Sequence, residues 1–259
     1  MHCILAIIDG FWAGELYVFC FKFYAKLQIL LYKYKKGVKM FFDINNWLNI
    51  VLGEPKDTFA EKLLFVGLQG SYNRGEATES SDIDLVVILE NVTFEDLKNY
   101  RLIIDNLSHK EKACGFISGK NELQKWSKAD MFQFYYDTKS LYGKLEDIIQ
   151  PPSLDEIKQS IKISSENLYH ATVHSFVHSN NYVEDLQNLY KMTFFILQAK
   201  YFVQTNNYIP TKKQLVEQLN ETEKEILNIC INKENILNYS QSEIETLYCK
   251  LIEWCSSNI

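Results

Sequence analysis

The sequence predicts an α+β fold, in which a mixed sheet with helices on one face is followed by a C-terminal all-α helical bundle. The sheet is predicted by apolar runs of strand length at residues 63–68 and 85–89, which flank a stretch rich in glycine and polar residues. The bundle is predicted by repeated capping patterns, in which Ser, Thr or Asn is followed three residues later by Glu or Gln. These patterns begin at Ser153, Thr211, Asn220 and Ser240.

Pro151-Pro152 marks the predicted boundary between a sheet domain over residues 40–150 and a helical bundle domain over residues 151–259. A fifth bundle helix is expected after Tyr182, because apolar residues recur there at helical spacing. The expected elements of the first domain are, in order, a helix over 43–53, strands over 63–68 and 85–89, a helix over 93–107, and strands over 113–118 and 131–136.

Residues 1–39 do not fit either domain. Their apolar runs are interrupted by Asp9 and Glu15, and no basic segment precedes the first run, so neither a membrane span nor a signal peptide is favoured. Our hypothesis is that Met40 is the native start and that 1–39 is a non-native upstream extension. The residues before Met40 motivate it, because their codons can include a ribosome-binding sequence of the AAAGGAG type.

The charge distribution favours a small substrate over a nucleic acid. The chain has 27 basic and 33 acidic residues, and residues 1–39 hold six of the lysines, so the remainder carries 21 basic against 31 acidic residues. An acidic body repels a polyphosphate backbone, which disfavours extended nucleic-acid binding. The six cysteines have no metal-binding spacing, which favours free thiols and a cytoplasmic location.

A phosphate-binding turn and two carboxylates lie between the first two predicted strands. Gly70 lets the backbone approach an anion, Ser71 adds a hydroxyl and an N–H, and Gly75 permits a left-handed corner. Asp82 and Asp84 are two residues apart on a strand and therefore point to the same face, with Ile83 between them facing the core. Two such carboxylates can bind one hard cation such as Mg²⁺.

The stretch from Gly70-Ser71, through ten intervening residues, to Asp82-Ile83-Asp84-Leu85 resembles the signature of the polymerase-β-like nucleotidyltransferase superfamily. It is similar to the branch that modifies small molecules, of which the aminoglycoside adenylyltransferases are an example. The resemblance implies transfer of a nucleoside monophosphate, AMP from ATP, onto a hydroxyl group. It covers about residues 40–259, and its specific residues lie within 68–89.

The resemblance also implies roles for individual residues. Asp82 and Asp84 would be catalytic and would bind Mg²⁺. The residues that would bind the nucleotide are Gly70, Ser71, Arg74, Gly75 and Ser81. Arg74 is one of two arginines in the chain, and its planar side chain can bind phosphate oxygens in a bidentate way. The alternative for Arg74 is a surface arginine that pairs with a neighbouring glutamate.

The sequence departs from the superfamily pattern at a third carboxylate, which would share a second metal and help to deprotonate the acceptor. The strand expected over 113–118 contains no acid. Glu122, four residues past that strand, is the candidate third metal ligand, and Asp130 is a weaker one. A solvated acid on a short helix is the favoured alternative for Glu122.

Two further groups are considered on the bundle. His170, His174 and His178 recur at helical spacing, so they share a face; a polar role there is favoured over metal binding. Lys191 and Lys200 are candidates for a lysine that reaches the triphosphate, since similar antibiotic-modifying enzymes have one, but reaching to solvent is commoner for such lysines.

We therefore predict an Mg²⁺-dependent nucleotidyltransferase with ATP as co-substrate and an aminoglycoside-like small molecule as acceptor. The predicted partners are a nucleoside triphosphate and this acceptor, without a membrane, and a homodimer is left open. One alternative is a protein-modifying or antitoxin-like minimal nucleotidyltransferase. The other is a catalytically silent nucleotide-binding domain, which the missing third acid would favour.

Overall fold

The computed structural model describes residues 44–259, so the predictions for residues 1–39 lie outside the described residues. The chain divides into two compact units, Met1–Leu48 and Asn49–Ile259. The first contributes only the start of helix α2 (Ile44–Phe59) to the described part. All contacts described below lie within the second unit. No helix of the described part is both long and apolar enough to cross a membrane.

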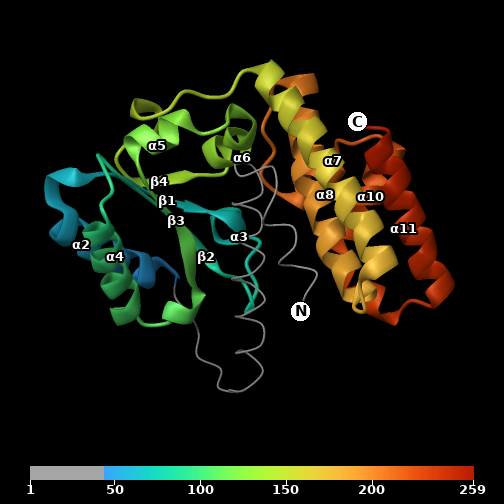
Figure 1. The fold of residues 1–259 in the computed structure, drawn as a ribbon, viewed down its shortest axis with the longest axis horizontal. Coiled ribbons are helices and arrows are strands. Elements are labelled where there is room, and N and C mark those ends of the chain that lie inside the picture. The colour runs from blue at the N-terminus through green and yellow to red at the C-terminus, as the bar shows by residue number, and fades with distance from the viewer. Residues whose placement is uncertain (1–43) are drawn as a thin grey trace. The chain divides into compact units, whose positions relative to one another are not determined.

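A mixed four-stranded sheet forms the centre of the first half of this unit (Figure 1). Its strand order is β3-β2-β1-β4, with β1 antiparallel to both β2 and β4 and with β2 parallel to β3. The strands are β1 (Leu63–Gln69), β2 (Ile83–Leu89), β3 (Ala113–Gly119) and β4 (Lys139–Tyr142). The predicted α+β class with a mixed sheet is confirmed.

Helices cover both faces of this sheet, because both faces of β1 and β2 are apolar. On one face, Val66 and Val87 pack with Phe59 of α2 and with α4 (Phe94–Asn106). On the other face, Phe65 and Val86 pack with α5 (Lys120–Lys125) and α6 (Met131–Tyr136). The sequence analysis placed helices on one face, and α5 and α6 add the second layer.

The strand predicted over 131–136 is wrong, because these residues form α6. Its apolar residues follow two helical stripes. Met131, Phe134 and Tyr135 pack on the sheet, at spacings of three and four. Phe132 and Tyr136, four residues apart, pack against the bundle instead. A short segment that is apolar on two sides lacks the polar face from which a helix is recognised in sequence.

The second half of the unit is helical, and the four predicted caps are confirmed. The side chains of Ser153, Thr211, Asn220 and Ser240 each accept a hydrogen bond from the backbone N–H three residues on. The fifth predicted helix is α8. The helices are α7 (Leu154–His178), α8 (Tyr182–Thr205), α9 (Lys212–Val216), α10 (Glu221–Ile231) and α11 (Gln241–Ser256).

The bundle packs against α6 through an aromatic and amide contact. Phe132 of α6 joins Ala199 and Phe202 of α8 in one apolar cluster. Beside it, Gln133 Nε2 donates a hydrogen bond to Gln198 Oε1 at 2.9 Å. Gln198 is 1% exposed, so this bond keeps a buried amide satisfied and fixes α6 against α8.

Helix α4 begins with a capping box that is reinforced by an ion pair. Asp96 Oδ2 accepts hydrogen bonds from Thr93 N at 2.7 Å and from Lys62 Nζ at 2.6 Å, and Thr93 Oγ1 accepts from Asp96 N at 3.2 Å. The hydrogen bond from Lys62, followed by those from Thr93, lowers the pKa of Asp96 to about 2. The charged form of this carboxylate is therefore stabilised by folding.

We expect Asp96→Asn to lower the free energy of unfolding by roughly 1 kcal/mol at pH 7, a value typical for the loss of a helix cap. Because the pKa of Asp96 is depressed on folding, its contribution is complete above the unfolded value of about 3.9 and is lost as the pH falls toward about 2. Urea unfolding of both proteins between pH 2 and pH 7 measures this. Asp105→Asn, an exposed acid at the end of α4, is the control. A penalty that does not shrink at low pH would contradict the assignment.

Candidate functional site

A tight turn leads from β1 into the short helix α3 (Gly70–Asn73). Gly70 has a φ of +74°, in the left-handed region that favours glycine. Arg74 N donates to Gly70 O at 3.1 Å and Glu76 N donates to Ser71 O at 2.8 Å, which closes the turn. The Gly70-Ser71 pair therefore lies at the end of a buried central strand, as the sequence predicts.

The carboxylate of Asp84 lies directly against this turn. In the antiparallel pairing of β1 and β2, Asp84 is opposite Gln69, the residue before Gly70. A Cβ atom added at Gly70 would collide with the Asp84 carboxylate, so position 70 has room only for glycine unless Asp84 moves. The close approach shows that Gly70 is required here for space as well as for its φ angle.

Asp82 precedes β2 by one residue and is 7% exposed. It is at the same sheet edge as the turn, because it is two residues before Asp84, which pairs with Gln69. Burial, and then the charge of Asp82, raise the pKa of Tyr72 in α3. Ile83 between the two aspartates is 0% exposed, which confirms that it faces the core. The structure thus brings Asp82 and Asp84 to the Gly70-Ser71 turn.

The loop between Arg74 and Asp82 is held by its own polar groups. Gly75 has a φ of +69°, which confirms the predicted left-handed corner. Ser81 Oγ accepts a hydrogen bond from Thr78 N at 2.8 Å, and Ser81 N donates to Thr78 O at 3.0 Å. Ser81 therefore closes this loop immediately before Asp82. A role in nucleotide binding for Ser71, Gly75 and Ser81 stays a prediction.

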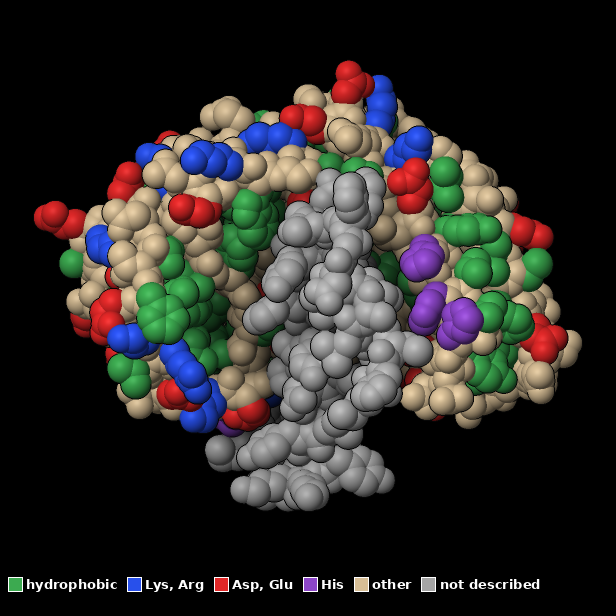
Figure 2. All heavy atoms as spheres, viewed as in Figure 1, with side chains coloured by type: hydrophobic (Ala, Val, Ile, Leu, Met, Phe, Trp, Pro, Cys, Tyr) green, Lys and Arg blue, Asp and Glu red, His purple; other side chains and the backbone are tan. Residues whose placement is uncertain are grey.

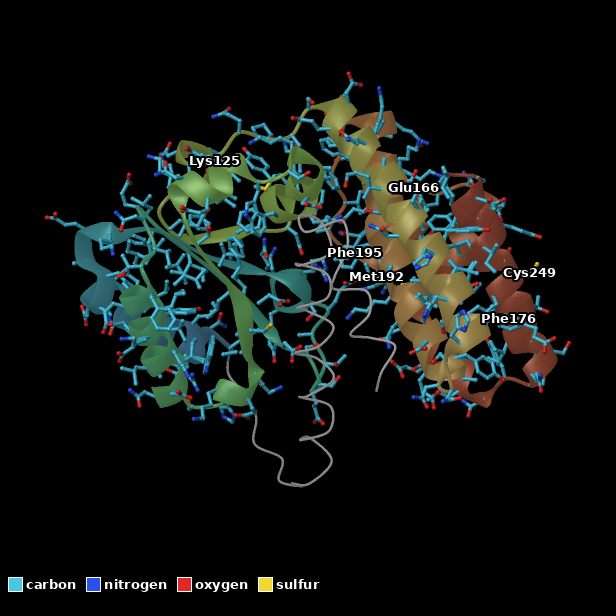
Figure 3. The ribbon with its side chains drawn as sticks, viewed as in Figure 1. Lys125, Glu166, Phe176, Met192, Phe195 and Cys249 are labelled. Atoms are coloured by element: carbon cyan, nitrogen blue, oxygen red, sulfur yellow. The ribbon has the colours of Figure 1, made fainter. Side chains whose placement is uncertain are left out.

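Arg74 is buried rather than on the surface, with a side-chain exposure of 7%. Its Nη1 donates to Asp137 Oδ2 and its Nε donates to Glu76 Oε2 at 3.3 Å. The guanidinium carbon also lies 5.6 and 5.9 Å from the ring centres of Phe194 and Phe195 on α8 (Phe195 is labelled in Figure 3). The surface alternative for Arg74 is therefore wrong, although the pairing with Glu76 occurs.

A lysine of the helical region does reach the motif loop, and it is Lys212 at the start of α9. Its backbone N and its Nζ each donate to Glu76, to Oε1 and Oε2 respectively, at 2.9 Å. Burial would raise the pKa of Glu76, but the hydrogen bonds and charge of Lys212 lower it below its ordinary value. Lys200, proposed from the sequence, pairs instead with Glu223 at 2.5 Å and with Asn258 at 2.6 Å.

Asp137, directly after α6, is a second residue that the sequence analysis missed. Its Oδ2 accepts from Gly70 N at 3.1 Å, and its backbone O accepts from Asn73 Nδ2 at 2.8 Å. Burial raises the pKa of its carboxyl, against the opposing charge of Arg74. No local pattern could have identified Asp137, because it lies 67 residues from Gly70 in the sequence.

Glu122 is not brought to the two aspartates. Strand β3 runs parallel to β2, with Cys114 beside Asp84 and Gly119 beside Leu89. Glu122 follows Gly119 and its carboxylate lies against that residue, at the opposite end of the strand from Asp84. Within residues 44–259, no three His, Cys, Asp or Glu side chains are grouped so that they could hold a metal.

The donor type of the two aspartates, carboxylate oxygen, is the type that Mg²⁺ takes. Mg²⁺ is bound in proteins by one or two carboxylates together with substrate phosphates and waters, so a complete protein cage is not required. Asp82 and Asp84 supply oxygen donors beside a turn suited to phosphate. The chemistry of the donor set therefore agrees with the predicted ion.

The three histidines lie on the exposed face of α7 (Figure 2). The ring centres of His170 and His174 are 6.1 Å apart, and those of His174 and His178 are 5.0 Å apart. They share a helix face, as the sequence predicts.

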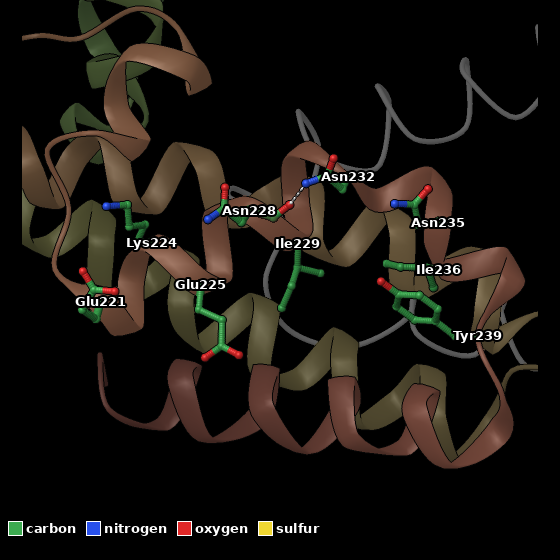
Figure 4. Close-up of a pocket in the computed structure, with 9 residues that line it drawn as sticks. All are labelled: Glu221, Lys224, Glu225, Asn228, Ile229, Asn232, Asn235, Ile236 and Tyr239. Atoms are coloured by element: carbon green, nitrogen blue, oxygen red, sulfur yellow. Dashed lines mark hydrogen bonds between the residues drawn. The ribbon is translucent and has the colours of Figure 1, made fainter.

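The helical region contains a hollow of about 390 Å³ between α10 and the following 3-10 helix, η6 (Lys233–Asn238) (Figure 4). Its lining includes Glu225, Asn228 and Tyr239 and none of the motif residues. We do not include this hollow in the candidate site.

With this geometry established, comparison with known proteins identifies the motif. Residues 56–167 match the family model described as a nucleotidyltransferase domain. This stretch is a nucleotidyltransferase domain. The resemblance inferred from Gly70-Ser71 and Asp82-Ile83-Asp84 is thereby confirmed, and the match supports the prediction of an enzyme of the nucleotidyltransferase class.

Two relatives extend the comparison. The chain is 37% identical over 62 residues to a putative protein adenylyltransferase of Methanocaldococcus jannaschii, covering 24% of this chain and 42% of the relative's length. Less than half of that relative is thus matched. The crystal structure of a spectinomycin adenyltransferase from Enterococcus faecialis, with ATP and spectinomycin, aligns with a TM-score of 0.51 and 17% identity. The alignment covers 81% of this chain and 99% of that one, and it supports a shared fold.

We expect Gly70→Ala to destabilise the nucleotidyltransferase domain more than Gly75→Ala does. Both residues have positive φ, which costs an alanine about 1–2 kcal/mol. At Gly70 the added methyl group also collides with Asp84, whereas nothing lies within 4 Å of a Cβ at Gly75. Urea unfolding of the two variants separates the steric effect from the φ effect. Equal losses would show that the contact between Gly70 and Asp84 does not constrain the turn.

Proposed function

We propose that this protein is an Mg²⁺-dependent nucleotidyltransferase that transfers AMP from ATP to a hydroxyl group of a small molecule. The single observation that carries the proposal is the placement of Asp84 against Gly70, with buried Asp82 beside the same turn. A family match alone would also fit a domain that has lost its site. Here the two carboxylates and the phosphate turn are within one compact constellation.

In the proposed reaction, each residue has a positioning or electrostatic task, as phosphoryl transfer requires. The Gly70-Ser71 turn would hold the triphosphate, and Asp82 and Asp84 would hold Mg²⁺, which would neutralise phosphate charge there. An acceptor hydroxyl forms a bond to the α-phosphorus, the bond to pyrophosphate breaks, and the hydroxyl proton leaves to solvent or to a nearby carboxylate. Arg74 and Lys212 place two cations beside the turn, each paired with a carboxylate of Asp137 or Glu76.

We propose a small, cationic acceptor because the chain outside residues 1–39 is acidic, with 21 basic against 31 acidic residues. The structurally similar spectinomycin adenyltransferase is described with ATP and spectinomycin, but the likeness itself extends to the fold alone. Among the cysteines of the described part, Cys230, Cys249 and Cys255 are free thiols, which supports the proposed cytoplasmic location. We also propose that the chain divides into a nucleotidyltransferase domain over residues 40–150 and a helical bundle domain over residues 151–259.

A second candidate is transfer of AMP to a protein hydroxyl. It is favoured by the 37% identity over 62 residues to a putative protein adenylyltransferase. The two candidates share the nucleotide site and differ in the acceptor, so one experiment with two acceptor pools distinguishes them.

We expect purified protein with Mg²⁺ and α-labelled ATP to transfer label to a small aminocyclitol or aminoglycoside acceptor. Asp84→Asn should lower kcat/KM at least about 100-fold, because the loss of a metal ligand removes several kcal/mol of transition-state stabilisation. Asp57→Asn, an exposed aspartate of α2, is the matched control and should retain activity. Label that enters only protein from a cell extract would favour the second candidate. ATP binding without any transfer would instead favour a catalytically silent domain.

A further inference from the structure

Asp137 links the phosphate turn to the segment between α6 and β4. One carboxylate oxygen accepts the N–H of Gly70 at 3.1 Å and also the Nη1–H of Arg74, and the Asp137 carbonyl accepts from Asn73 at 2.8 Å. Asp137 thus holds three residues of the turn, Gly70, Asn73 and Arg74. Asp137 belongs to a different segment of the chain and is not part of the sequence motif.

The same segment holds the residue before the turn. Gln69 Nε2 donates to Phe134 O at 3.2 Å and to Thr138 Oγ1 at 2.5 Å. Segment 134–138 therefore contacts both ends of the sequence from Gln69 to Arg74. Since α6 is packed on the sheet and on α8, this segment is a rigid support for the turn.

Burying the Asp137 carboxylate costs free energy, which indicates that its contacts with Gly70 and Arg74 do more than fill space. Asp137 is 6% exposed, and a buried carboxylate loses its hydration. A buried ion pair such as that with Arg74 often contributes little net stability compared with apolar residues, and its attested benefit is to select one arrangement. Here the arrangement selected is that of Gly70 and Arg74.

The hydrogen bonds made by Asp137 also limit which donor groups of the turn can bind a phosphate. The Gly70 N–H already donates to Asp137, so the N–H groups that would meet a phosphate are those that follow it in α3. Asp137 and Glu76 hold Arg74 at Nη1 and Nε, which fixes the plane of the guanidinium. Because the guanidinium is planar with its donors in a rigid fork, its orientation determines whether it can bind phosphate oxygens in a bidentate way.

We propose that Asp137 is a positioning residue for the triphosphate, acting by holding the Gly70 turn and the Arg74 guanidinium in their binding orientation. This inference rests on the proposed function, since it assigns Asp137 to the nucleotide site of the same reaction. Asp137 lies outside the sequence motif and orients Gly70 and Arg74 without touching the reacting atoms.

The test compares Asp137→Asn with wild type in the full chain. Asparagine keeps the size of the side chain and can still accept from Gly70 N–H, but it loses the charge that holds Arg74. We expect the KM for ATP and the Kd for Mg·ATP to rise about tenfold, the loss expected for one charge-assisted hydrogen bond, with kcat and the KM for the acceptor changed less than about threefold. Asp137→Glu, which keeps the charge, should recover part of the affinity.

The matched control is Asp96→Asn, because Asp96 is also a buried, ion-paired carboxylate, at 7% exposure. It should lower stability and leave the KM for ATP unchanged. If Asp137 acts through Arg74, the double variant Asp137→Asn/Arg74→Met should bind ATP no more weakly than Arg74→Met alone. Additive losses would overturn this route.

Hydrogen exchange measured without nucleotide tests the positioning role of Asp137 separately from the proposed function. Hydrogen exchange of the Gly70 amide should be slow in wild type and faster in Asp137→Ala, which has no acceptor for this N–H. If wild type binds no ATP, the proposed function fails and the positioning role fails with it. If wild type binds ATP and Asp137→Asn binds it equally well, the positioning role alone is overturned. Fast exchange of Gly70 in wild type would also overturn it.

Discussion

The antiparallel pairing of β1 and β2 is the constraint on which the candidate site depends. It sets Asp84 opposite Gln69, so that the strand end carrying the carboxylate and the strand end leading into the turn meet at the same edge of the sheet. Each strand is buried on both sides, so a slip of one residue would exchange side chains between two differently packed faces and disrupt the packing of both. The packing of the sheet thereby fixes the distance between Asp84 and Gly70.

Around this pair, charged groups connect the turn to the helical region. Arg74 lies between two carboxylates, Asp137 and Glu76, and Glu76 in turn accepts from Lys212. Two cations and two anions balance one another, which limits the cost of their low exposure. The ring of Phe194 lies 4.7 Å from Lys212 Nζ and completes the contact from α8.

Local patterns were sufficient for much of the fold and for the motif. Strands β1, β2 and β3, the caps at Ser153 and Ser240, and the burial of Ile83 follow from apolar runs and hydrogen-bond chemistry over a few residues, whereas β4 was not predicted. Local patterns failed for α6, which is apolar on two sides. They also failed for Glu122, because its position depends on whether β3 pairs parallel or antiparallel to β2. Asp137 and Lys212 were missed because their partners are distant in sequence, so no spacing rule applies to them.

Those long separations affect the order in which the protein can assemble during synthesis. Asp137 follows Gly70 by 67 residues and Lys212 follows Glu76 by 136 residues. When the ribosome has just translated the motif, Asp137 and Lys212 have therefore not yet been synthesised. Loop closure over such distances is slow compared with the formation of helices and hairpins. A nascent chain thus carries the glycine turn and the paired aspartates before it can form the hydrogen bonds that hold them in the final structure.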